Sequence, residues 1–274
     1  MNASQSDKAS RFRALHERPG AFVIPNVWDG ASACVVAGLG FEALATSSSA
    51  CANTLGRLDG QITREEALAH ARVIVAASAL PVSADLEQGF GDAPEAVAET
   101  IRQAAAAGLV GGSIEDASGN SQAPIYDFEL AVERIAAAVE AARKLAFPFT
   151  LTARTENYVN GRPDLEDTVR RLQAFERAGA DVLFAPGLPD IAAVRTVCSA
   201  LKKPVNFMVG IRGRSFSVAE LADAGVRRIS LSTSLYRAAM TGLYAAAREV
   251  KESGTFGYLE TIMSSKDLAG FLGQ

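Results

Sequence analysis

The chain contains few of the residues on which nucleophilic and redox catalysis depend. Its 274 residues include two histidines, three cysteines and one tryptophan. His16 and His70 both fall on predicted helices rather than after strands, so no Ser-His or Cys-His nucleophile is available. Cys34, Cys51 and Cys198 are far apart and form no C-x-x-C pair. This spacing argues against a disulfide framework or a zinc site and indicates a reducing compartment.

Blocks of positive charge and long apolar runs are also absent. The net charge is -4 and the pI is about 5.4, so we expect no nucleic-acid partner. No apolar run approaches the roughly 18–20 residues that span a membrane. Residues 1–10 are polar and lack the apolar core of a signal peptide. We therefore expect a globular cytoplasmic protein with no membrane partner.

Lysine is rare and follows none of the predicted strands, which argues against a Schiff-base aldolase. The six lysines are Lys8, Lys144, Lys202, Lys203, Lys251 and Lys266.

What the chain does contain is a regular alternation of short apolar runs and helical patterns. About eight such strand–helix units in one chain of this length predict an α/β fold of the (β/α)₈ barrel class, over residues 1–253. A doubly wound open sheet is the alternative, but no G-x-G-x-x-G follows the first strand. The predicted strands are 22–25, 41–45, 82–85, 112–114, 149–153, 182–185, 205–209 and 228–231.

Residues 254–274 carry one further apolar helix pattern, for which a closed barrel has no obvious place. Two interpretations stand: the segment docks on another subunit, or it packs on its own barrel. The apolar positions are Leu259, Ile262, Met263, Leu268, Phe271 and Leu272.

Polar residues follow four consecutive strands of the predicted barrel. Because the carboxyl ends of barrel strands meet at one mouth, we expect these side chains to converge there. This convergence is stronger evidence than any single pair. The residues are Ser47, Ser48, Asp85, Glu87, Glu115, Asp116, Arg154 and Glu156.

Asp85 and Glu87 lie in V-S-A-D-L-E-Q-G-F-G-D, at the end of an apolar run. Residues i and i+2 of an extended chain point to one face, so we expect both carboxylates to leave the strand together. Such like charges favour a hard cation, Mg²⁺ or Mn²⁺, with Glu115 as a third acid that binds partly through water. The alternatives are solvated carboxylates for the pair and an ordinary ion pair for Glu115.

Arg154 ends the apolar run T-L-T-A, where a charge is unexpected. It predicts a bidentate clamp on a substrate carboxylate or phosphate, or else a structural bridge to one of the acids. Ser47-Ser48-Ser49 could present hydroxyl and N–H groups to an anion or form a plain loop. Metal plus arginine indicates a site that polarises a 2-oxo acid and stabilises an enolate.

Five motifs over residues 22–272 resemble the isocitrate lyase/phosphoenolpyruvate mutase superfamily. They are N-V-W-D-G-A-S-A (26–33), S-S-S-A-C-A-N-T-L-G-R-L-D (47–59), A-D-L-E-Q-G-F-G (84–91), G-S-I-E-D (112–116) and T-A-R-T-E (152–156). The resemblance implies a (β/α)₈ barrel whose terminal helix is exchanged between subunits, usually in a tetramer. It also implies Mg²⁺ and 2-oxo acids handled through enolpyruvate-like species.

The resemblance assigns roles to individual residues. Asp85 matches the direct metal ligand, and Glu87 and Glu115 match acids that hold the metal partly through water. Ser47 and the Ser48 backbone match the loop that grips the substrate carboxylate or phosphoryl group. The remaining matches are Arg154 for substrate binding and catalysis, Asp59 as an acid after the second strand, and Trp28 and Asn120 as further substrate-binding positions.

The chain departs from the family at the gating loop. Lyases that cleave isocitrate or methylisocitrate carry K-(K/R)-C-G-H there, whereas this chain reads D-A-S-G-N-S-Q at 116–122. Those lyases also carry a glutamate after the sixth strand, where this chain has Ala185-Pro186. Mutases and phosphonopyruvate hydrolases place a lysine before an Asn-Ser pair, and only Asn120-Ser121 answers to that.

Three hypotheses follow. The first is a Mg²⁺-dependent lyase that makes or breaks a C–C bond next to a 2-oxo acid, as in oxaloacetate decarboxylation. The second is P–C or P–O chemistry on phosphonopyruvate or phosphoenolpyruvate. The third is a 2-oxo-acid binding protein that has kept the metal site and lost catalysis.

Overall fold

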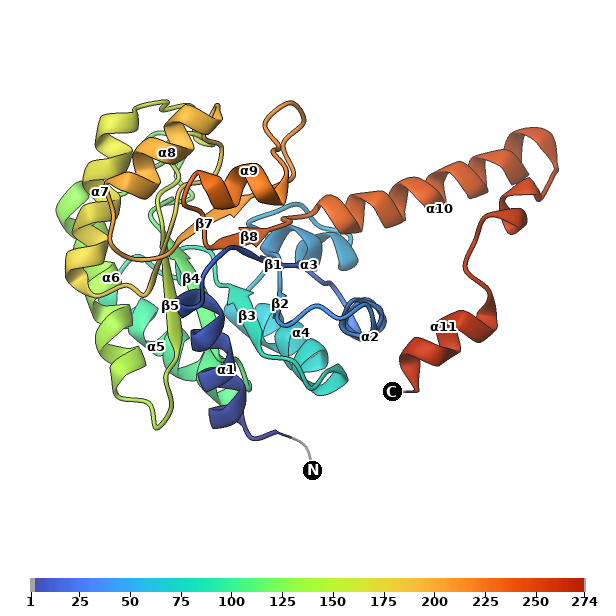
Figure 1. Cartoon of the computed structure of the whole chain (residues 1–274), viewed down its shortest axis with the longest axis horizontal. Helices are drawn as coiled ribbons and strands as arrows, with labels where there is room; N and C mark the ends of the chain where they lie inside the picture. The colour runs from blue at the N-terminus through green and yellow to red at the C-terminus, as the bar shows by residue number, and fades with distance from the viewer. Residues whose placement is uncertain (1–2, 274) are drawn as a thin grey trace.

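Eight parallel strands form a closed barrel in the computed structural model, which describes residues 3–273 (Figure 1). The strands pair in the order β1-β8-β7-β6-β5-β4-β3-β2, and a parallel bridge between Asn26 and Ala45 joins β1 to β2. The predicted (β/α)₈ barrel is confirmed, and the open doubly wound sheet is wrong. The strands are β1 (Phe22–Ile24), β2 (Leu44–Ala45), β3 (Val82–Asp85), β4 (Gly111–Glu115), β5 (Thr150–Arg154), β6 (Val182–Phe184), β7 (Val205–Met208) and β8 (Arg228–Ser230).

Helices surround the barrel, and most of them begin after a residue whose side chain accepts from a free N–H group. Thr63 and Glu66 form a capping box at the start of α4. Ser4 and Asp7 form another, so α1 begins at Gln5. The helices are α1 (Gln5–Glu17), α2 (Gly30–Gly38), α3 (Ser48–Thr54), α4 (Arg64–Ala77), α5 (Pro94–Ala106), α6 (Phe128–Arg143), α7 (Leu165–Ala178), α8 (Ile191–Ser199), α9 (Val218–Asp223), α10 (Ser234–Ser253) and α11 (Ser265–Leu272), with a 3₁₀ turn η1 (Gly257–Glu260) before α11.

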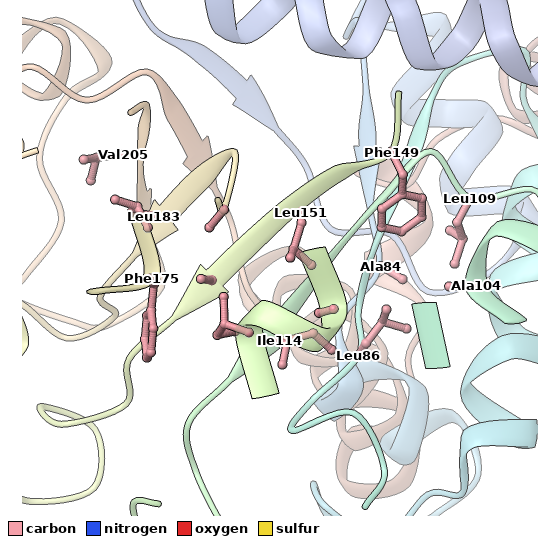
Figure 2. Packing of buried hydrophobic residues seen from close by; sticks show 14 of the residues in the cluster. Ala84, Leu86, Ala104, Leu109, Ile114, Phe149, Leu151, Phe175, Leu183 and Val205 are labelled. Carbon is pink, nitrogen blue, oxygen red and sulfur yellow. The ribbon is translucent and has the colours of Figure 1, made fainter. Parts of the chain in front are cut away.

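The main core lies between the strands and the helices that cover them. Figure 2 shows Leu86, Ile114, Leu151, Phe175 and Leu183 gathered around β4, β5 and β6. All five side chains are buried, and each contributes roughly 1.5–3 kcal/mol to folding through its removal from water. This packing holds the ends of neighbouring strands in fixed positions, which is what a site built on strand ends requires.

Helix α1 closes the amino-terminal end of the barrel. Phe12 is fully buried and lies so close to Gly111 of β4 that a Cβ there would come within 2.9 Å of its ring. His16 packs edge-on against Phe12 and Phe22, with ring centroids 4.8 and 5.0 Å away. Its Nδ1 donates to the Phe12 carbonyl at 2.9 Å. Burial, helped by the charge of Arg228, lowers the pKa of His16 to about 3.

The last helices leave the barrel. Helix α10 projects away from it, and α11 returns to contact α2 (Figure 1). Within residues 3–273, no residue of α10, η1 or α11 is buried, and the apolar side chains of Leu243, Tyr244 and Ile262 are more than half exposed. Packing of this segment on its own barrel therefore rests on a few contacts, chiefly α11 against α2 and Tyr236 of α10 against Trp28. None of the described helices is both long and apolar enough to cross a bilayer.

Candidate active site

The ends of β3, β4 and β5 bring an arginine and two acids together. Arg154 Nη1 lies 3.3 Å from Glu115 Oε2 and 3.7 Å from Asp85 Oδ1. Its Nε contacts the carboxylate of Glu156, which follows on the same chain. Burial alone would lower the pKa of Arg154, but the charges of Glu156, Glu115 and Asp85 raise it well above its usual value. The guanidinium is therefore permanently charged and shared among three carboxyl groups.

Glu87 reaches the mouth through a turn and not through strand alternation. Strand β3 ends at Asp85, and Glu87 has a left-handed backbone with a φ of 49°. The expectation that both acids share a face of an extended chain is thus wrong, because the chain turns immediately after Asp85. The turn still keeps the two together, since the Glu87 N–H donates to Asp85 Oδ1 at 3.3 Å. A left-handed non-glycine residue is uncommon and clusters at functional sites.

The carboxylate of Glu87 is poorly satisfied. Its Oε1 is buried and has no hydrogen-bond partner within residues 3–273. Burial raises the pKa of Glu87 to about 8, and the nearby charges of Asp85 and Asp59 add to the effect. Burial likewise raises the pKa of Glu115 well above its usual value, although Arg154 opposes the shift. Both acids are destabilised in their charged forms and would be stabilised by a cation.

Arg134 of α6 holds the turn that carries Glu87. Its Nη1 donates to the Gly91 carbonyl at 2.7 Å, and its guanidinium also contacts the carbonyls of Gln88 and Asp92. The guanidinium lies over the Tyr126 ring, 4.2 Å from the centroid. The left-handed backbone of Glu87 is therefore fixed by a buried cation outside the mouth.

The donor set suits a hard cation, but the protein supplies only part of a coordination shell. Within the described chain, no three Asp, Glu, His or Cys side chains lie close enough together to hold an ion directly. Arg154 contacts both Asp85 and Glu115, so their oxygens are partly engaged. The unsatisfied Glu87 Oε1 is a carboxylate oxygen of the kind Mg²⁺ prefers, and Mg²⁺ commonly keeps several waters. The residues fit Mg²⁺ with water in the remaining positions.

The serine stretch after β2 begins a helix that the sequence did not predict. Ser47 caps α3, and its Oγ accepts a hydrogen bond from the Ala50 N–H at 3.3 Å. The Ser48 N–H and Oγ both donate to Asp85 Oδ2, at 3.2 and 3.0 Å. The helix N-terminus therefore orients Asp85 and presents N–H groups to the mouth.

Two connected cavities open at this mouth, and Ser48, Asp59 and Arg154 line both. Partial desolvation, followed by the charge of Asp85, raises the pKa of Asp59. Asn120 lines the outer cavity, and its Oδ1 accepts from the Gln122 N–H at 2.9 Å. The loop of residues 117–124 closes on itself, because a bridge pairs Ala117 with Ile125.

Trp28 is the one predicted substrate-binding residue that lies apart from the others. It is not among the described residues that line either cavity. Its indole packs edge-on against Tyr236 of α10, with centroids 5.5 Å apart, and its carbonyl lies 2.7 Å from His70 Nε2. Its role in binding remains a prediction.

Asp116 was predicted at the mouth but is buried beneath it. It accepts from Thr155 Oγ1 at 2.9 Å, from the Glu156 N–H at 2.8 Å and from Arg171 Nη1 at 3.2 Å. Burial raises the pKa of Asp116 to about 6. The side chain thus ties the end of β4 to the residues after β5 and sets the position of Arg154. Nothing in the spacing of Glu115 and Asp116 distinguishes these two roles.

The arrangement matches a known family. A model described as phosphoenolpyruvate phosphomutase matches residues 12–251. The chain belongs to this family. With it, the predicted membership of the isocitrate lyase/phosphoenolpyruvate mutase superfamily is confirmed.

Relatives of the phosphoenolpyruvate phosphomutase family cover nearly the whole chain. A solved structure of a lyase/mutase-like protein from Burkholderia cenocepacia J2315 is 52% identical, with a TM-score of 0.96 over 98% of this chain and 97% of the other. A 2-methylisocitrate lyase of Aeropyrum pernix is 30% identical over 89% of this chain and 80% of its own. An oxaloacetate decarboxylase of Ectopseudomonas mendocina is 30% identical over 91% and 86%. The prediction of a carbon–carbon lyase is confirmed at the level of enzyme class.

Proposed function

We propose that this chain is a Mg²⁺-dependent lyase that makes or breaks a C–C bond next to a 2-oxo acid through an enolpyruvate-like species. One observation carries the proposal: the unsatisfied Glu87 carboxylate lies beside Asp85 and near Arg154, at the mouth of a (β/α)₈ barrel of this family. Mn²⁺ is the alternative ion. The acids supply the oxygen ligands and the arginine supplies the charge for a carboxylate or enolate.

Each residue at the mouth has its own role in the proposed reaction. Asp85 would hold the ion directly, and Glu87 and Glu115 would hold it partly through water. The ion supplies a Lewis acid for the 2-oxo group. Arg154 binds the substrate and stabilises negative charge on the enolate oxygen, while Ser47 and the Ser48 N–H orient the carboxylate. Asp59 at the rim, whose pKa is raised by burial and by the charge of Asp85, is the proposed acid of the site.

Oxaloacetate decarboxylation is the simplest version of this reaction. It needs the ion, Arg154 and a proton source, and it needs no second organic product to be held by the gating loop. That suits a loop of residues 117–124 without cysteine, lysine or histidine. Asn120, in the outer cavity, is the loop residue that binds substrate in this proposal.

The test is a ¹H and ³¹P NMR time course with Mg²⁺ and a substrate panel. The panel holds oxaloacetate, methylisocitrate, phosphonopyruvate and phosphoenolpyruvate, each with a chelator control. We expect chelator-sensitive conversion of a C–C substrate that is lost in Asp85→Ala and retained in Glu133→Gln, a charge change on the exposed face of α6. Full activity in the presence of chelator would contradict the proposal.

The family model also supports a second candidate, P–C or P–O chemistry on phosphonopyruvate or phosphoenolpyruvate. A ³¹P shift change or phosphate release would identify it in the same experiment. Thermal stabilisation by oxalate plus Mg²⁺, with no conversion of any panel member, would indicate a binding protein instead.

The proposed enzyme works as a homo-oligomer, a dimer or tetramer, in which α10 and α11 pack on a neighbouring subunit. Support comes from the apolar residues of α10 and η1 that face solvent, including Leu243, Tyr244 and Leu259. Light scattering after size exclusion should give a multiple of 28.7 kDa. A monomer at micromolar concentration would contradict this part of the proposal.

A further inference from the structure

The barrel interior holds a second arginine that the proposed reaction does not use. Arg228 is the first residue of β8, and only 5% of it is exposed. Its Nε donates to Asn206 Oδ1 and its Nη2 to Thr152 Oγ1, each at 2.9 Å. Its Nη1 is buried and has no hydrogen-bond partner anywhere in the described chain. The guanidinium therefore has donor capacity that the protein leaves unused.

No acid balances this charge. Among residues 3–273, no aspartate or glutamate forms an ion pair with Arg228, and both of its partners are neutral. Burial lowers the pKa of Arg228 to about 9, so the group is still charged at neutral pH. Buried charges are normally paired, because removing them from water is strongly unfavourable. An unpaired guanidinium inside a barrel indicates an anion that the protein itself does not provide.

The charge belongs to the same cavity as the mouth. Arg154 and Arg228 both line the inner cavity, whose wall between them includes Ser83, Ser113 and Ser230. Barrel interiors are usually filled by branched apolar side chains, so these small polar residues leave an open and wettable path. Arg228 bonds Thr152, which lies two residues before Arg154 on β5 and so about 6–7 Å below it along the strand. The two arginines therefore line one cavity at different depths, an arrangement that suits a small molecule with two anionic groups.

We propose that the floor of the inner cavity is an anion subsite whose positive charge is Arg228. It takes the second carboxylate of a ligand whose first carboxylate lies at the mouth near Arg154. This inference rests on the proposed function for its first carboxylate and goes beyond it in assigning the second. Arg228 is then a specificity-determining residue that favours dicarboxylates over monocarboxylates of the same shape.

The test compares succinate with its monoamide, succinamate, by titration calorimetry in the presence of Mg²⁺. The two ligands have the same length, and only one carries the second charge. Wild type should bind succinate about tenfold or more tightly, and Arg228→Gln should abolish that preference. Arg228→Lys keeps the charge and should retain most of it. Arg227→Gln is the matched control, because it removes the same charge from the neighbouring residue, whose side chain donates within residues 3–273 only to the Gly20 carbonyl.

Several outcomes overturn the inference. Equal affinity of the wild type for succinate and succinamate overturns it, whether or not Arg228→Gln folds. A preference that survives in Arg228→Gln, or disappears equally in Arg227→Gln, does so as well. If chloride binds in an Arg228-dependent way without competing with succinate, the subsite holds a free anion and the second-carboxylate assignment is wrong.

Oxalate keeps this test separate from the proposed function, because it is too short to reach the floor. Oxalate that binds with Mg²⁺ while succinate shows no preference contradicts the Arg228 subsite alone. Failure of oxalate itself to bind contradicts the proposed function and the subsite together.

Discussion

Burial shifts the pKa of one titratable group at each end of the barrel, but the surroundings of the two groups differ. At the mouth, burial raises the pKa of Glu87 to about 8, and at the bottom it lowers that of His16 to about 3. Both shifts favour the neutral form. Glu87 lines an open cavity beside other acids, whereas His16 packs between Phe12 and Phe22. The same kind of pKa shift therefore accompanies an acid-lined cavity at one end and an aromatic enclosure at the other, where His16 is 6% exposed.

The largest effect at the mouth is expected for Asp85→Asn, which removes the proposed metal ligand while keeping the shape of the side chain. We expect turnover and oxalate–Mg²⁺ affinity to fall by about 100-fold or more. The free energy of unfolding should change by less than about 1 kcal/mol, because the lost charge also repelled Glu87. Calorimetry and urea unfolding measure the two effects. Oxalate binding at the wild-type level would remove Asp85 from the metal site.

At the bottom of the barrel, acid should reduce stability through His16. Its folded pKa of about 3 lies below the unfolded value of 6.5, so the unfolded state binds the proton first. The contribution is fully present above pH 6.5 and is lost as the pH falls toward 3. Between pH 8 and pH 5 this amounts to about 2 kcal/mol.

The control for this prediction is His16→Met, which cannot titrate. Its free energy of unfolding should fall less between pH 8 and pH 5 than that of wild type. Parallel curves for the two proteins would show that His16 is charged, or exposed, in the folded state.

The smallest expected effect compares helix caps at the two ends. Ser47→Ala and Ser4→Ala each remove an N-cap and should reduce stability by about 1 kcal/mol. Only Ser47→Ala should also weaken oxalate binding, because Ser47 lies at the mouth and Ser4 on the helix that closes the bottom. Equal oxalate affinities in the two variants would reduce Ser47 to a structural cap.

The sequence predicts the convergence at the mouth because parallel strand ends share one edge of a barrel. Asp85, Glu115 and Arg154 each end a recognisable strand, so their meeting follows from topology alone. Helix α3 was missed because S-S-S-A-C-A-N contains no apolar periodicity and depends on the Ser47 cap. Glu87 lies at the mouth as predicted, but a left-handed turn brings it there and not strand alternation. Nothing in the sequence predicts a left-handed backbone at an acidic residue.

The enclosed position of Arg228 could not be predicted from the sequence. Arg227 and Arg228 are adjacent and chemically identical, and strand alternation sends one outward and the other inward. Sequence patterning places the charged residues of a barrel strand on its outer face, so it does not indicate which of the two arginines points inward. The three-dimensional register, with Asn206 on β7 and Thr152 on β5 as partners, decides which guanidinium is enclosed.

The anchoring of the Glu87 turn by Arg134 has a consequence for substitutions in residues 117–124. The anchor reaches the turn from α6, whereas the loop of residues 117–124 closes on its own Ala117–Ile125 bridge. The half of the site proposed to hold the ion is thus anchored to α6 through hydrogen bonds that do not involve residues 117–124. We therefore expect substitutions within residues 117–124 to leave the Glu87 turn in place.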